Sequence, residues 1–306
     1  MREGKPLTMV ILAAGMGRRY GGLKQIEPVG PCGELLLDYS VYDAWRAGFR
    51  RVVFVVRPEM QAAFDTKVGK EYRSRVEVIY AHQRVDDLPS PWVAPPGRIK
   101  PWGTAHAVLV AAPALDDSFA VANADDFYGA GSFERVAEFL REPQMGDVPT
   151  HAMVCFALRD TLSETGEVSR GLCRCTGDGW LIEITETTGL QRHGTGARQV
   201  RPDGTERLFP GDTSVSMNLW AFQHCFLEQV RAGFTLFLRE HGPSADREFY
   251  LPGAVNELVQ AQRARVRVLS TRDRWCGITH QQDLARAADH IRELVARGDY
   301  PARLWT

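Results

Sequence analysis

The chain has 306 residues and a net charge of −1, and 44% of its residues are apolar while 25% are charged. A chain of this length can bury a substantial core, and this composition is typical of soluble globular proteins. The near-zero charge gives no basic footprint for nucleic acid, and no apolar run approaches the roughly 20 residues that span a membrane. We therefore expect neither nucleic acid nor a membrane as a partner.

The start of the chain and its cysteines bear on location. MREGKP leads directly into an apolar stretch, which does not match a secretory signal peptide. The six cysteines are scattered, as in reduced cytoplasmic proteins. Cys173 and Cys175 are two positions apart, and we interpret them as neighbours on one face of a strand rather than as metal ligands. We expect a cytoplasmic protein, and the sequence leaves open whether identical chains associate.

A glycine-rich loop follows the first predicted strand, Leu7–Ala14. Four glycines fall within eight positions, and basic residues punctuate them: Gly15, Gly17, Gly21 and Gly22, with Arg18, Arg19 and Lys24. Glycine permits φ > 0 and close approach, so successive backbone N–H groups can curl around an anion while the cations add full charges. The spacing matches neither the Walker pattern nor GxGxxG. The pattern therefore predicts a phosphate-binding loop of another kind.

Strands and helices alternate through the next part of the chain. We predict a helix at Asp38–Ala47 with Gly48 as its C-cap, strands at Arg51–Val56 and Val76–Ala81, a helix at Glu59–Thr66, and a strand at Phe119–Asn123. Such alternation favours a parallel sheet with helices on both faces. Ligands of these sheets bind beyond the carboxyl ends of the strands, where the first loop lies.

The segment Arg84–Lys100 interrupts this alternation with four prolines. Its composition predicts irregular structure, either a flap over a ligand or a surface insertion. The sequence PWGTAHA follows and opens a helix that runs to about Ala112. Gly103 would let a flat ligand approach the backbone, and Thr104 can cap this helix.

Two consecutive carboxylates, Asp125 and Asp126, follow the strand Phe119–Asn123 after one intervening residue, Ala124. These side chains should lie on the same rim as the first loop. Mg²⁺ commonly uses one or two carboxylates together with substrate phosphates. We therefore predict a Mg²⁺ site with Asp125 as a ligand.

The second half of the chain is richer in short strands. We predict strands at Ala152–Leu158, Gly171–Thr176, Trp180–Glu186, Thr213–Phe222 and Val266–Leu269, and helices at Phe226–Glu240, Asp246–Gln260 and Gln281–Arg297. No internal repeat or flexible linker is apparent. We expect one domain over residues 1–306.

Several segments resemble the signature motifs of the nucleotidyltransferases that activate sugar phosphates and related metabolites. These are LAAGMGRR, which ends at Arg19, with GGLK in the first loop, GTAHA at Gly103–Ala107, and Ala124-Asp125 in place of Gly-Asp. The short gap from Arg19 to Lys24 is similar to the molybdopterin nucleotidyltransferases. The resemblance implies a Rossmann-like α/β fold of the glycosyltransferase-A type, with a mostly parallel central sheet and extra short strands in the second half. It also implies a nucleotide-binding half at about 1–145 and an acceptor-binding half at about 146–306.

The same resemblance implies roles for individual residues. Arg19, Lys24 and Asp125 would be catalytic, with Mg²⁺ on Asp125. Nucleotide-binding residues would be Leu12, Ala13, Ala14, Gly15, Gly17, Gln83, Gly103 and Thr104. Acceptor-binding residues would be Gly171, Glu186 and Asn218. We give His106 no role in proton transfer.

Two positions depart from the family pattern. Thr187 stands where a lysine meets the sugar phosphate, and Gly277 stands where an aspartate is the second metal ligand. Asp273, Asp246 and Asp212 are nearby substitutes among which the sequence does not choose.

The motifs favour condensation of UTP or dTTP with a sugar 1-phosphate, releasing pyrophosphate. One alternative is a cytidylyl- or guanylyltransferase with a non-sugar phosphate acceptor, which the short Arg19–Lys24 gap favours. Another is a non-catalytic nucleotide-binding regulator, motivated by Thr187 and Gly277. A dehydrogenase fits poorly because the first loop lacks GxGxxG and no acidic residue follows at dinucleotide spacing.

Overall fold

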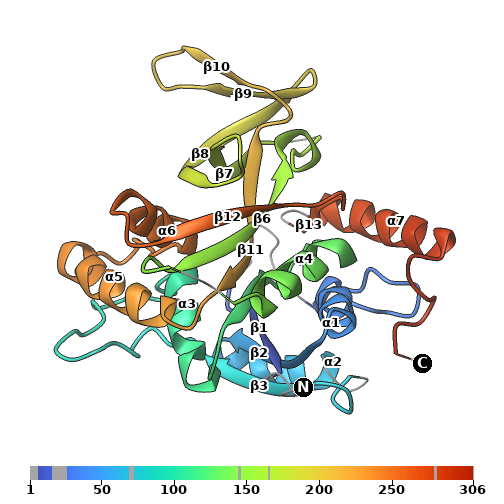
Figure 1. The fold of residues 1–306 in the computed structure, drawn as a ribbon, viewed down its shortest axis with the longest axis horizontal. Coiled ribbons are helices and arrows are strands. Elements are labelled where there is room, and N and C mark those ends of the chain that lie inside the picture. Colours follow the sequence, from blue (N-terminus) through green and yellow to red (C-terminus); the bar gives the residue numbers. More distant parts are fainter. Residues whose placement is uncertain are drawn as a thin grey trace.

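The computed structural model describes residues 6–15, 26–68, 72–143, 146–164, 166–278 and 281–305. One large sheet runs through the molecule, with helices on both faces (Figure 1). The first half contains β1 (Leu7–Leu12), α1 (Leu36–Arg46), β2 (Phe49–Val56), α2 (Gln61–Lys67), β3 (Glu77–His82), α3 (Thr104–Ala111), β4 (Phe119–Asn123), β5 (Asp126–Phe127) and α4 (Ala130–Arg141). The second half contains β6 (Thr150–Ala157), β7 (Val168–Cys175), β8 (Leu181–His193), β9 (Gly196–Val200), β10 (Glu206–Phe209), β11 (Ser214–Phe222), α5 (Phe226–His241), α6 (Leu251–Gln260), β12 (Arg265–Ser270), β13 (Cys276–Gly277) and α7 (Gln281–Arg297).

The sheet is parallel in the first half of the chain and largely antiparallel in the second. Its main strand order is β10-β9-β8-β7-β11-β4-β1-β2-β3, and β6 pairs with both β11 and β12. Strands β4, β1, β2 and β3 are parallel neighbours, whereas β11 runs antiparallel to β4 and β7. The strand–helix alternation of the sequence thus corresponds to a parallel sheet, as predicted.

Strand β1 shows why helices must cover both faces. Successive side chains of a strand point to opposite faces, and every residue from Met9 to Ala14 is buried. Met9, Ile11 and Ala13 belong to the core that includes α1, α4 and α7, whereas Val10, Leu12 and Ala14 belong to the core that includes α3, α5 and α6. An uninterrupted apolar run is therefore a central strand buried on both sides.

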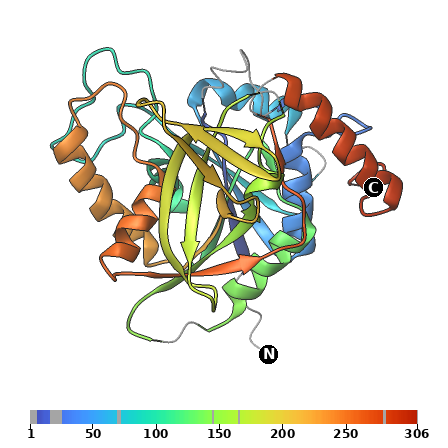
Figure 2. The same cartoon turned by 90° about the horizontal axis from the view of Figure 1, so that it is seen from above.

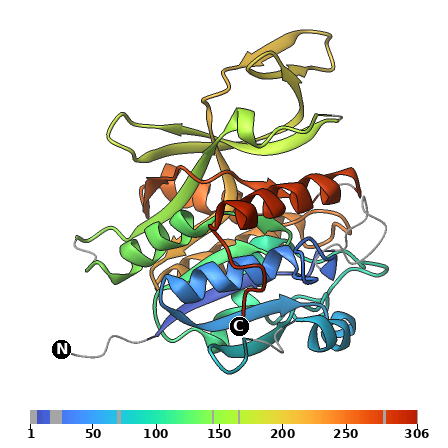
Figure 3. The same cartoon turned by 90° about the vertical axis from the view of Figure 1, so that its right-hand side faces the viewer.

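Strands β7 to β10 extend beyond the helical layers (Figures 1 and 3). From above, this extension lies between α5 and α6 on one side and α7 on the other (Figure 2).

The Cys173 and Cys175 side chains both lie in the α3–α5–α6 core, as expected for neighbours on one strand face. None of the described helices is long and apolar enough to cross a bilayer.

Some element boundaries differ from the sequence predictions. The helix expected at Asp246–Gln260 begins only at Leu251, because the backbone at Phe249 is hydrogen-bonded to Trp102 and Ala105. The strand expected to end at Glu186 continues to His193, where it pairs with β9. The helix α4 and the hairpin β9–β10 were not predicted.

Candidate active site

The first and fourth strands end side by side at one edge of the sheet. Leu12 is opposite Asn123 in the parallel register of β1 and β4, and the N–H of Ala124 donates to the Leu12 carbonyl at 3.1 Å. Because both strands run in the same direction, the segment Ala13–Gly15 and the turn that holds Asp125 leave the sheet at the same edge. The start of the glycine-rich loop and the predicted metal ligand therefore lie on one rim.

The glycine-rich loop is described only at its beginning. Leu12 and Ala14 are buried toward α3, Ala13 is buried toward α1, and Gly15 is exposed at the rim. Gly17, Arg19 and Lys24 lie outside the described residues, so their predicted roles in phosphate binding stay predictions.

Gly277 has a direct steric explanation. Strands β5 and β13 pair so that Gly277 is opposite Asp126, and the carbonyl of Asp125 accepts from the N–H of Ile278 at 3.0 Å. A Cβ atom on Gly277 would lie 2.3 Å from Oδ1 of Asp126 and 2.4 Å from the Trp275 ring. The carboxylate of Asp126 thus occupies the space into which a side chain at position 277 would extend.

Asp126 is a buried carboxylate held by its neighbours. Its Oδ2 accepts from Nδ2 of Asn123 at 2.8 Å and from the hydroxyl of Tyr128 at 3.2 Å. Asp125 is half-buried beside it. Among the described residues, no three His, Cys, Asp or Glu side chains converge on one point. Carboxylates of two consecutive residues nevertheless suit Mg²⁺, which can take its remaining ligands from substrate phosphates and water.

The other aspartates considered from the sequence lie elsewhere. Asp273 caps α4, because its Oδ2 accepts from the N–H of Ser132 at 2.6 Å and from the hydroxyl of Thr271 at 2.9 Å. Asp212 and Asp246 are exposed. Asp273 is therefore committed to holding the start of a helix, which leaves Asp126 as the carboxylate next to Asp125.

Gln83 and Gly103 form one buried unit despite the proline-rich segment between them. Nε2 of Gln83 donates to the Gly103 carbonyl at 2.9 Å, and the Gln83 side chain is buried. Gly103 has φ +103°, and a Cβ there would lie 2.5 Å from the carbonyl oxygen of Phe249. The sequence GTAHA therefore requires glycine for close backbone packing, and Gln83 holds the peptide in place.

Thr104 and His106 also have structural partners. The hydroxyl of Thr104 accepts from the N–H of Leu251 at 2.8 Å, so Thr104 caps α6. The prediction that it caps its own helix, α3, was wrong. Nδ1 of His106 lies 3.1 Å from Nε2 of Gln83, and its Nε2 lies 3.3 Å from the Asp87 carbonyl. Burial lowers the pKa of His106 to about 4. A neutral ring in these contacts supports the packing of the motif.

The proline-rich segment is fastened to the loop that precedes α6. Arg98 stacks 3.5 Å above the Trp102 ring and donates to the carbonyls of Ser244 at 2.7 Å and Arg247 at 2.8 Å. Lys100 forms an ion pair with Glu248 at 2.6 Å. These contacts favour the surface-insertion interpretation of this segment over a flap.

Three predicted acceptor-binding residues come from adjacent strands. Gly171 on β7 is opposite Glu186 on β8 and opposite Ser216 on β11. Asn218, two residues after Ser216, has φ +62°, and its Oδ1 accepts from Nε1 of Trp220 at 3.2 Å. Burial raises the pKa of Glu186, although the nearby Arg170 guanidinium opposes this. The structure brings these residues together but tests no role for them.

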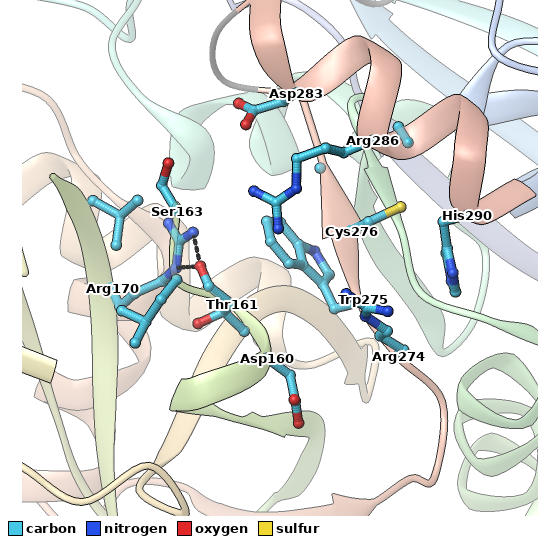
Figure 4. A pocket seen from close by; sticks show the side chains of 14 residues that line it. Asp160, Thr161, Ser163, Arg170, Arg274, Trp275, Cys276, Asp283, Arg286 and His290 are labelled. Atoms are coloured by element: carbon cyan, nitrogen blue, oxygen red, sulfur yellow. Dashed lines mark hydrogen bonds between the residues drawn. The ribbon is translucent and has the colours of Figure 1, made fainter. Parts of the chain in front are cut away.

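A pocket that the sequence did not reveal lies between β7, β13 and α7 (Figure 4). Its charged lining includes Arg170, Arg274, Arg286, Asp160 and Asp283, and Trp275 and Gly277 also line it. Since Gly277 is opposite Asp126, this part of the lining borders Asp126. The signals available in the sequence were the positions of Arg170, directly before Gly171, and of Trp275, two residues before Gly277.

Comparisons with known proteins concern the family and the fold of this chain. The family model described as nucleotidyl transferase matches residues 8–155, so this region belongs to the nucleotidyl transferase family. The protein is an enzyme of the nucleotidyltransferase class. No curated protein matches the sequence.

Solved structures support the fold over nearly the whole chain. One similar structure is that of a Bacillus anthracis protein named as a glucose-1-phosphate thymidylyltransferase, solved in complex with a sucrose. It is 15% identical in sequence and has a TM-score of 0.63. The match covers 94% of this chain and 96% of that one. The inositol-1-phosphate CTP transferase from T. maritima is 14% identical with a TM-score of 0.60, and the match covers 95% and 98%. At these identities, the similarity concerns the fold alone.

Proposed function

We propose that the protein transfers a nucleotidyl group from a nucleoside triphosphate to the phosphate of a small acceptor and releases pyrophosphate. The proposal rests on one observation: β1 and β4 are parallel neighbours, so the glycine-rich loop and Asp125 start from the same edge of the sheet. An anion-binding loop beside a carboxylate pair suits a triphosphate with its divalent cation.

The reaction is an in-line displacement at the α-phosphorus. An oxygen of the acceptor phosphate attacks, and pyrophosphate leaves. Because the attacking phosphate is already an anion, neither a covalent nucleophile nor a strong general base is needed. Catalysis then depends on alignment and charge neutralisation. In this proposal the amides of Gly15–Gly17 and Arg19 hold the departing phosphates, while Lys24 faces the α-phosphate.

The carboxylates would hold the metal. Asp125 and Asp126 are the residues that fit Mg²⁺, which when bound would neutralise charge on the reacting phosphates as a Lewis acid. The backbone of Asp125 is held by Ile278, and Asp126 by Asn123 and Tyr128. The Asp126 carboxylate and the backbone at Asp125 would need little rearrangement to accept the cation.

The motifs favour particular substrates. By its resemblance to the family motif, GTAHA favours a uracil or thymine base, although the space beside Gly103 is filled by the backbone of Phe249 rather than open to a ring. Gly171, Glu186 and Asn218 favour a sugar 1-phosphate as the acceptor. Nucleoside triphosphates are cytoplasmic metabolites, and all six cysteines are free thiols, which supports a cytoplasmic location.

A second candidate is a cytidylyl- or guanylyltransferase with a non-sugar phosphate acceptor. The short gap between Arg19 and Lys24 favours it, as does the fold shared with an inositol-1-phosphate CTP transferase. A third candidate, a non-catalytic regulator, was motivated by Thr187 and Gly277. The regulator loses part of its support because Asp126 occupies the space next to Gly277.

Two assays separate these candidates. A thermal-shift panel of UTP, dTTP, CTP, GTP and ATP with Mg²⁺ should show the largest shift with UTP or dTTP, and a preference for CTP or GTP would favour the second candidate. A pyrophosphate-release screen that crosses the same nucleotides with sugar 1-phosphates and inositol 1-phosphate should then identify a productive pair. Nucleotide binding without pyrophosphate release from any pair would favour the regulator.

A further inference from the structure

Arg170 on β7 places a positive charge beside Thr187 on β8, the neutral residue that stands where the family pattern has a lysine. In the antiparallel register of β7 and β8, Arg170 is opposite Thr187. Side chains that are directly opposite leave the same face of such a pair. The cation at this point of the sheet therefore comes from β7, one position before Gly171.

The Arg170 guanidinium is held by backbone carbonyls. Nε and one terminal nitrogen donate to the carbonyl of Thr161, the Nε bond at 3.1 Å, and the other terminal nitrogen donates to the carbonyl of Ser169 at 2.8 Å. Three of the five N–H groups are thereby used. The remaining two have no acceptor among the described residues.

The charge of Arg170 is not neutralised by a contacting carboxylate. Within the described part of the chain Arg170 makes no ion pair, and burial lowers its pKa while Asp126, Glu186 and Asp283 oppose this from a distance. A partly buried cation without a paired anion is energetically costly. A bound anion would remove this cost.

A second guanidinium faces Arg170 across the pocket. In Figure 4, Arg170 points inward from β7 and Arg286 points inward from α7, with the Trp275 ring beneath them. The Arg170 guanidinium carbon lies 5.2 Å from the centroid of that ring. Nε1 of Trp275 is buried and has no hydrogen-bond partner among the described residues. Arg286 also forms no ion pair with the described residues, so both cations are available to one ligand.

We propose that Arg170 and Arg286 bind the phosphate of the acceptor, a hydroxyl-bearing phosphate monoester. This inference rests on the proposed function. Guanidinium groups bind phosphate oxygens in a bidentate manner. The lining at Gly277 borders Asp126, so a phosphate held here would lie toward Asp126. Asp283 and Asp160 in the same lining disfavour an acceptor with a further carboxylate and suit one with hydroxyl groups.

Binding of glucose 1-phosphate to the full-length protein, measured by calorimetry without nucleotide, tests the inference. Arg170→Gln and Arg286→Gln should each weaken binding at least about tenfold, the loss expected for a charge-assisted contact. Arg174→Gln is the matched control, because Arg174 lies on the same strand, is exposed and pairs with Glu183. It should change the affinity less than about twofold. Glucose should not compete.

Arg286 lies on an exposed helix face, so its substitution keeps the test valid if Arg170→Gln fails to fold. Wild-type affinity in Arg286→Gln and in any folded Arg170→Gln would overturn the inference. So would a wild-type protein that binds none of glucose 1-phosphate, inositol 1-phosphate and glycerol phosphate. If pyrophosphate release continues with an unchanged KM for the acceptor in both variants, the inference fails and the proposed function stands. If the arginines bind glucose 1-phosphate but no nucleotide pair releases pyrophosphate, the proposed function fails and the anion site stands.

Discussion

The side-chain amide of Gln83 donates a hydrogen bond to the backbone carbonyl of Gly103 at 2.9 Å, and both groups are buried. This contact links the end of β3 to the motif that starts α3, across an inserted segment of irregular structure. Gln83 therefore positions the GTAHA motif by binding the Gly103 carbonyl.

Gln83→Leu should therefore destabilise the protein and weaken nucleotide binding. The Gly103 carbonyl would keep the N–H of Ala107 as a donor at 3.1 Å but would lose the Gln83 amide, and the loss of one hydrogen bond costs about 0.5–1.5 kcal/mol. Gln199→Leu is a matched control, because Gln199 donates to the Thr188 carbonyl at 2.8 Å in an exposed site far along the chain. Urea unfolding and the KM for the nucleotide would measure both effects. Equal losses in the two variants would mean that the Gln83–Gly103 contact has no special role.

Gly103→Ala tests whether position 103 needs glycine because of the nearby Phe249 backbone as well as because of its positive φ. Gly97 also has positive φ, at +78°, but nothing lies within 4 Å of a Cβ built there. Gly97→Ala should cost about 1–3 kcal/mol for strain alone. Gly103→Ala should cost at least about 1 kcal/mol more, because the added methyl group meets the carbonyl of Phe249. Chemical unfolding of both variants would check this, and similar losses would contradict it.

Acid should destabilise the protein through His106. Burial lowers the pKa of this imidazole from 6.5 to about 4, so between these values the unfolded chain binds a proton that the folded chain does not. The stability contributed by the neutral ring is complete above about pH 6.5 and is lost as the pH falls toward 4. At 1.36 kcal/mol per pKa unit, the loss approaches about 3 kcal/mol. Protonation at Nδ1 would also oppose the Gln83 amide.

Urea unfolding of wild type and His106→Gln at pH 7.5 and pH 4.5 would measure this loss. The variant should lose less stability on acidification than wild type does. His193→Gln, at the exposed end of β8, is the control and should keep the wild-type dependence. An unchanged dependence in His106→Gln would show that His106 is not responsible.

Much of the parallel part of the fold, although not α4, and the last helix could be predicted from sequence because their signals are local. The strand Phe119–Asn123 and the helix Gln281–Arg297 agree with the structure residue for residue. The hairpin β9–β10 was missed because three of the four β10 residues are exposed, so no alternation of buried and exposed positions marks that strand. Short strands such as β5 and β13 exist only because distant segments pair.

In the candidate site too, residues in local motifs were predicted, whereas residues that depend on distant contacts were missed. Asp125 and Gly103 were found through motifs that are contiguous in the chain. Arg170 was missed because its pairing with Thr187 depends on a register that shifts between Val168 and Arg170. Thr104 was assigned to its own helix because its partner, Leu251, is 147 positions away. Contacts of this kind depend on tertiary structure that local patterns do not encode.

The rate of pyrophosphate release with Mg²⁺, compared between wild type, Lys24→Ala and Asp125→Ala, tests the central claim most directly. Loss of one preorganised charge contact typically lowers the rate roughly 10²–10³-fold. We expect at least that loss in each variant, with far-UV circular dichroism unchanged. Near-normal turnover in both variants would contradict the claim that the glycine-rich loop and Asp125 form one nucleotidyl-transfer site.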